Sequence, residues 1–123
     1  MDTRQKILTL DQARQLSGAA AMAIGAFDVL RASTIRELQN VRSQLPEGGI
    51  LLVVVLADGV FLTQEARAEL AAALRMVDYV VTAEGEAADR LGESLKCSPI
   101  VRLSEGDAQR SRELKEHVRG RQK

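Results

Sequence analysis

One stretch of the chain, residues 21–34, combines residue types that together could hold a phosphate group. Its sequence is Ala-Met-Ala-Ile-Gly-Ala-Phe-Asp-Val-Leu-Arg-Ala-Ser-Thr, an apolar segment with a glycine followed by polar residues that suit the start of a helix. A strand, a turn and a helix start in this order direct backbone N–H groups and the positive end of the helix dipole toward the turn. Arg31 adds a guanidinium, whose planar fork suits phosphate oxygens. The stretch therefore predicts an anion-binding turn.

The same stretch resembles a known family. Residues 25–30, Gly-Ala-Phe-Asp-Val-Leu, are similar to the Gly-x-Phe-Asp-x-Leu motif of the cytidylyltransferase-like nucleotidyltransferases, most closely the nucleotidyltransferase domain of ADP-heptose synthase. Asp58 stands where this family has an acidic residue after its second strand. Residues 67–81 are similar to the family's Arg-Ala-Glu-x-Leu-Ala-Ala-Leu-x-x-Val-Asp-Tyr-Val. The resemblance extends over about residues 6–82 of the chain.

This resemblance implies a ligand and a set of binding residues. Members of the family use ATP or CTP with Mg²⁺, join the nucleotide to a sugar or polyol phosphate and release pyrophosphate. Matched residue by residue, these positions are implied to contact the nucleotide or phosphate: Gly25, Phe27, Asp28, Arg31, Thr34, Asp58 and Arg67. No metal site made by protein side chains is expected.

The chain departs from the family at the groups that stabilise the transition state. Both histidines of the family's His-x-Gly-His motif are absent, because residues 31–34 are Arg-Ala-Ser-Thr, and the loop after Asp58 lacks the family's lysine. Loss of one such donor lowers a rate by about 10²–10³. We therefore interpret the chain as a degenerate nucleotidyltransferase-like protein that binds a nucleotide or phosphate ligand with little or no catalysis. The alternatives are an active nucleotidyltransferase and a purely structural dimer.

Several of these positions also have a structural explanation. Asp28 and Asp58 suit turns and caps, and Thr34 with Glu37 has the spacing of a capping box. Arg31 could be a solvated side chain or a partner of Asp28. The sequence leaves these alternatives open.

Apolar runs and helical periods alternate along the chain. Thr9 and Gln12 have the spacing of a capping box, which predicts the start of a short first helix. Strands are expected at residues 21–27, 50–56, 78–81 and 99–103. Further helices are expected at residues 33–45, 63–76, 86–95 and 107–118. This order predicts an α/β fold, a Rossmann-like open parallel sheet of about four to five strands with helices on both faces. Residues 50–56 should form the central strand beside residues 21–27, and ligands should bind beyond the carboxyl ends of the strands.

The helix expected over residues 63–76 carries an arginine of the resemblance. Its period predicts a buried side that contains Ala66, Leu70, Ala73 and Leu74. Arg67 should then lie exposed.

Length and charge limit the remaining possibilities. The 123 residues suit a single domain, residues 1–123, and 17 basic residues balance 17 acidic ones, so no net field draws the chain to nucleic acid. No apolar run approaches the roughly 20 residues that span a bilayer, so a cytoplasmic protein without a membrane partner is expected. Cys97 and His117 are expected to be structural or surface residues. Alanine-rich helices and the habit of the family lead us to expect a homodimer.

Overall fold

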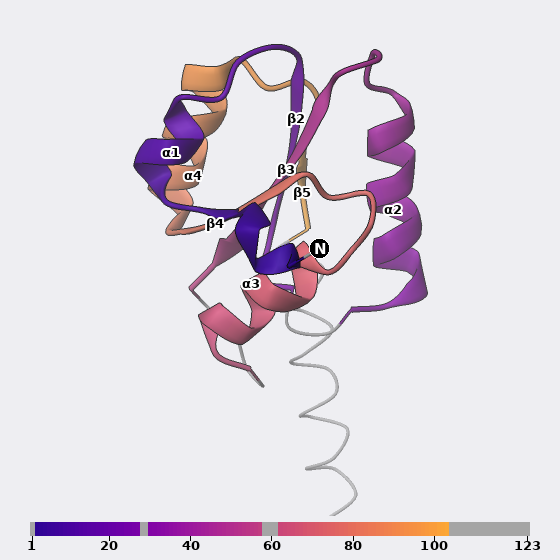
Figure 1. The fold of residues 1–123 in the computed structure, drawn as a ribbon, viewed down its shortest axis with the longest axis vertical. Helices are drawn as coiled ribbons and strands as arrows, with labels where there is room; N and C mark the ends of the chain where they lie inside the picture. Colours follow the sequence, from indigo (N-terminus) through magenta and orange to yellow (C-terminus); the bar gives the residue numbers. More distant parts are fainter. Residues whose placement is uncertain (1, 28–29, 58–61, 104–123) are drawn as a thin grey trace, which may run out of the picture.

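The chain folds into a five-stranded sheet with helices packed on both faces (Figure 1). A computed structural model describes residues 2–27, 30–57 and 62–103. Its elements are η1 (Thr3–Lys6), β1 (Ile7–Leu8), α1 (Leu10–Arg14), β2 (Ala20–Gly25), α2 (Ala32–Ser43), β3 (Ile50–Leu56), α3 (Gln64–Ala72), β4 (Tyr79–Ala83), α4 (Gly85–Leu95) and β5 (Ile100–Arg102). All strand pairs are parallel, in the order β1-β4-β3-β2-β5. The predicted α/β fold with an open parallel sheet is confirmed, whereas the helix expected at residues 107–118 lies outside the described residues.

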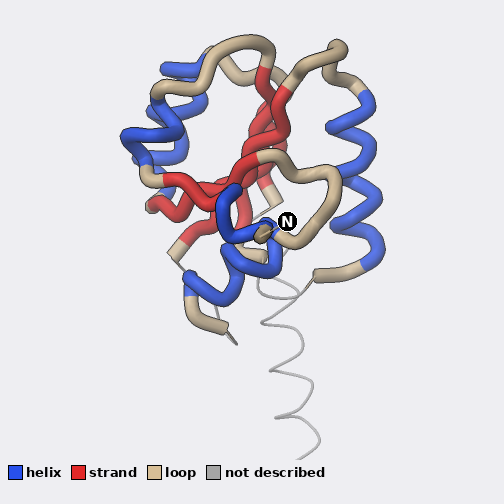
Figure 2. The backbone as a smooth tube through the Cα atoms, in the orientation of Figure 1, coloured by secondary structure: helices blue, strands red, loops and turns tan. Residues whose placement is uncertain are grey.

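β3 occupies the centre of the sheet, as its uninterrupted aliphatic sequence predicts. Ile50 is partly buried and every later residue of β3 is buried. On one side Ala20 pairs with Ile50 and Gly25 with Val55, and on the other side β4 pairs along the same strand. Apolar surface buried on both faces stabilises this position by about 25 cal/mol per Å². The prediction of a central strand beside β2 is confirmed (Figure 2).

The two faces of the sheet belong to two separate cores. Leu51, Val53 and Val55 pack in a cluster with residues of α2 and α3. Leu52 and Val54 pack in a second cluster with residues of α1 and α4. Figure 1 shows α1 and α4 together on one side of the sheet and α2 on the other. Because successive side chains of a strand point to opposite faces of the sheet, the apolar residues of β3 pack alternately against the two helical layers.

The start of α2 differs from its prediction. The helix begins at Ala32 with Arg31 as N-cap, so Thr34 is the third helical residue and caps nothing. The expected capping box with Glu37 is wrong. Thr34 lies on the buried face of α2 together with Leu38 and Val41, at helical spacing, and packing against the sheet fixes it there.

The buried face of α3 also differs from its prediction. The buried residues are Arg67, Ala68, Ala71 and Ala72, whereas Leu70 is 42 % exposed. The helical period was right, but the face that it assigned to the core was wrong. The arginine takes an inward position because carbonyl groups below the helix accept its hydrogen bonds, as described below.

The beginning of the chain holds one confirmed and one missed feature. The capping box of α1 is present, because the Thr9 hydroxyl accepts from the Gln12 amide at 3.1 Å and the Gln12 side chain accepts from the Thr9 amide at 2.9 Å. Sequence reasoning did not assign β1, which pairs with β4 at the edge of the sheet. A strand of two residues is too short to show a period.

Two leucine truncations test the assignment of the cores. We expect Leu52→Ala, in the fully buried centre of β3, to lower the free energy of unfolding by about 2–5 kcal/mol, because it leaves a cavity. Leu70→Ala is the matched control on the exposed side of α3 and should change it by no more than about 0.5 kcal/mol. Urea unfolding followed by circular dichroism measures both. Equal losses in the two variants would contradict the assigned face of α3.

Candidate functional site

The candidate site lies at the carboxyl edge of the sheet, beside the end of β2. Along the chain β3 and β4 are added on one side of β2, whereas β5 pairs with its other side, so the strand order reverses between β2 and β5. Ligands of open parallel sheets bind beyond such a reversal. Gly25 is the last residue of β2, and the Leu103 amide after β5 donates to the Ile24 carbonyl at 2.6 Å. The expected edge is therefore formed by the residues that follow Gly25.

Phe27 turns the chain out of β2 in a backbone conformation that is costly for its residue type. Its φ is 55°, and its side chain is 0 % exposed. A positive φ in a non-glycine residue costs about 1–3 kcal/mol. Gly25 lies in the strand, within the expected residues 21–27, and Phe27 takes the left-handed position after it. Glycine would adopt this φ freely but would lack the ring that packs in the core under α2 and α3.

The N-terminus of α2 has no side-chain cap from the residues that the structure describes. The first helical bond runs from the Ile35 amide to the Arg31 carbonyl, so the amides of Ala32, Ser33 and Thr34 have no acceptor within the helix. Arg31, the N-cap residue, makes no capping hydrogen bond, and the first turn has no acidic residue. A cation at the positive end of a helix is unfavourable by itself. α3, in contrast, is capped by the Thr63 hydroxyl and has Glu65 in its first turn.

Thr34 lies directly behind these amides. It is 2 % exposed and points with Leu38 toward the sheet. We call Phe27, Arg31, Thr34 and the first-turn amides of α2 the α2 site. A group that enters this site would meet the N–H donors of the exposed first turn, beside the exposed residue Arg31.

Arg67 reaches the same edge from α3 and is almost fully buried, at 1 % exposed. Its Nη1 donates to the Ala26 carbonyl at 2.6 Å and to the Leu56 carbonyl at 2.7 Å. Its Nη2 donates to the Ala57 carbonyl at 3.1 Å, and its Nε is shared between the carbonyls of Leu62 and Thr63 at 3.2 and 3.3 Å. The expectation of an exposed Arg67 is therefore wrong. The guanidinium joins the ends of β2 and β3 from below the site.

The fold gathers most of the residues that the resemblance implied. Gly25 and Phe27 follow one another at the end of β2, Arg31 and Thr34 open α2, and Arg67 binds the Ala26 carbonyl between Gly25 and Phe27. Asp28 and Asp58 lie outside the described residues. Sequence reasoning missed the left-handed Phe27 and the burial of Arg67. The one hint of the left-handed backbone of Phe27 in the sequence is that this bulky residue stands next to an expected turn.

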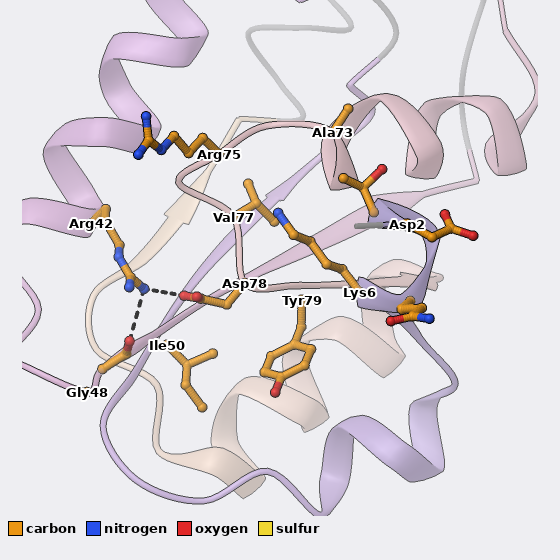
Figure 3. A pocket seen from close by; sticks show the side chains of 13 residues that line it. Asp2, Lys6, Arg42, Gly48, Ile50, Ala73, Arg75, Val77, Asp78 and Tyr79 are labelled. Carbon is orange, nitrogen blue, oxygen red and sulfur yellow. Dashed lines mark hydrogen bonds and ion pairs between the residues drawn. The ribbon is translucent and has the colours of Figure 1, made fainter.

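Sequence reasoning also missed a hollow at the opposite, amino edge of the sheet (Figure 3). This pocket of about 840 Å³ is lined by residues of η1, the end of α2, the starts of β3 and β4 and the segment after α3. On its wall Arg42 forms an ion pair with Asp78 and donates to the Gly49 carbonyl at 2.9 Å. Asp78 also accepts from the Leu51 amide at 2.8 Å. These bonds tie α2, β3 and β4 together.

Comparisons and searches add no further identifying feature. The chain matches no model of a known protein family, and no curated protein is significantly similar to it. Within residues 2–27, 30–57 and 62–103, no three histidine, cysteine or acidic residues come together as a metal site, and no helix has the length and apolar character needed to cross a bilayer. Cys97 is buried, and burial raises the pKa of its thiol. The site must therefore be interpreted from its own geometry.

The ion pair at the amino edge can be tested by two aspartate variants. We expect Asp78→Ala to lower the free energy of unfolding by about 1–3 kcal/mol, because it leaves the Leu51 amide without its acceptor and the Arg42 guanidinium without its charged partner. Asp11→Ala removes an exposed aspartate that also pairs with an arginine, Arg14, and should cost at most about 1 kcal/mol. Chemical denaturation of both variants provides the comparison. A loss for Asp78→Ala no larger than that for Asp11→Ala would contradict this account.

Proposed function

We propose that the protein binds a nucleotide or another small phosphorylated ligand at the α2 site, with little or no catalysis. The observation that carries this proposal is the start of α2, where the amides of Ala32, Ser33 and Thr34 have no acceptor within the helix and the N-cap residue is an arginine. A phosphate would accept from these amides and offset the repulsion between Arg31 and the helix dipole. Mg²⁺ would accompany ATP or CTP through the phosphate oxygens.

The side chains of the α2 site suit binding better than group transfer. Arginine stays protonated and presents a broad fork, which holds a ground-state phosphate. Catalysis needs contacts that strengthen in the transition state, and one fork does not replace two imidazoles on opposite sides of a transferring group. Thr34 cannot supply the second imidazole either, since its short side chain is buried and uncharged.

Three further expectations belong to the same proposal. Asp28 and Asp58 would stand beside the bound ligand, as the resemblance to nucleotidyltransferases implies. The protein would act in the cytoplasm and without nucleic acid or a membrane as partner. A homodimer would form through the exposed side of α3, where Leu70 lies.

The role of Arg31 in binding can be measured directly. We expect the wild-type chain to bind ATP, CTP or pyrophosphate in isothermal titration calorimetry. Arg31→Ala should weaken that binding by about 1–3 kcal/mol, the scale of a charge-assisted hydrogen bond. Arg36→Ala is the matched control, because Arg36 is an exposed arginine on the same helix, beyond its first turn. Equal affinities of the two variants would remove Arg31 from the site.

The absence of catalysis is a separate prediction. With ATP or CTP, Mg²⁺ and a heptose, glycerol or ribitol phosphate, the unmodified protein should release no pyrophosphate above background. An assay that converts pyrophosphate to phosphate detects turnover. Robust turnover would establish instead the alternative, an active nucleotidyltransferase of the ADP-heptose synthase kind.

A further inference from the structure

The guanidinium of Arg67 is the most extensively bonded side chain at the carboxyl edge. Its bonds to the described residues all run to backbone carbonyls, and these belong to separate segments: the end of β2, the end of β3 and the residues before α3. One Nη1 atom bridges Ala26 and Leu56, which lie on neighbouring strands. The side chain therefore fixes the separation between the two strand ends that open toward the site.

One of these bonds bears directly on Phe27. The Ala26 carbonyl belongs to the peptide group that ends at the Phe27 nitrogen, so a hydrogen bond to this oxygen orients that peptide plane. The next dihedral along the chain is the φ of 55°. Strained backbone persists only where the surroundings hold it. The hydrogen bond from Arg67 restrains the peptide group before Phe27, and burial restrains the Phe27 ring.

The charge of Arg67 has no ionic partner in the described part of the chain. No carboxylate there lies within ion-pairing distance of its guanidinium, and its contacts are neutral carbonyls. A buried charge usually has a counter-charge, since its desolvation is expensive. The α2 site lies beside the carbonyl that Arg67 binds.

We propose that Arg67 is the positioning residue of the α2 site: its guanidinium holds the Ala26–Phe27 peptide in the orientation that presents the first turn of α2 to an anion. This inference rests on the proposed function for its ligand, but not for its effect on Phe27. Arg67 touches no ligand in this scheme. It acts through the backbone.

The test uses two substitutions at Arg67 and one control. Arg67→Met removes the charge and all donors, Arg67→Lys keeps the charge but loses the fork, and Arg75→Met removes an exposed arginine. Inorganic pyrophosphate is the probe, titrated by calorimetry against each folded protein. Backbone chemical shifts and coupling constants from nuclear magnetic resonance, recorded without the probe, report the φ of Phe27.

We expect Arg67→Lys to bind pyrophosphate about tenfold more weakly than the wild type, and Arg67→Met to bind at least a hundredfold more weakly. Phe27 should leave the left-handed region in Arg67→Met, whereas Arg75→Met should leave both readouts unchanged. If Arg67→Met does not fold, Arg67→Lys decides through the same two readouts.

Two outcomes separate this inference from the proposed function. If the wild type binds no pyrophosphate, the anion ligand is wrong, and the φ of Phe27 in the variants still decides whether Arg67 sets the turn. If folded Arg67 variants keep wild-type affinity and a left-handed Phe27, Arg67 is a stabilising residue only and the inference is overturned.

Discussion

The burial of β3 on both faces is the constraint on which the rest of the molecule depends. Its aliphatic side chains alternate between the two cores, so helices must cover both sides of the sheet. Parallel strands then require helical crossovers, and each crossover brings the start of a helix to the carboxyl edge. The α2 site is a consequence of this geometry. β2, which ends below it, is held along its length by pairing with β3.

Local sequence predicted the elements but not every contact between them. The bounds of β3 match the predicted residues 50–56, because seven aliphatic residues flanked by glycine and alanine leave no other assignment. β1 could not be found, since its strand character comes from pairing with β4. The outward face of α3 was misassigned for a similar reason. An arginine has no local preference for burial, and only carbonyls from distant segments make the inside favourable for Arg67.

For the candidate site, too, the sequence predicted some features and not others. Its expected location followed from the strand, turn and helix around Gly25, and in the structure Phe27 comes shortly after β2 while Arg31 and Thr34 lie at the start of α2. Its conformation did not follow, because a left-handed phenylalanine contradicts local preference. Such conflicts between local preference and tertiary structure are expected where function requires a particular backbone. Phe27 and Arg67 are the two places where this chain departs from local rules most clearly.

Cations lie at both edges of the sheet, but their interaction with the helix dipoles is favourable at one edge and unfavourable at the other. At the amino edge Lys6 donates to the Leu74 carbonyl at 3.2 Å just beyond α3, and Arg42 lies in the last turn of α2. Both complement the negative ends of helices, and helix stability accounts for them. At the carboxyl edge Arg31 stands at the positive end of α2, where the same reasoning predicts a cost. A bound anion would turn that cost into an attraction, and for this reason the proposed ligand site is the α2 site and not the hollow at the amino edge.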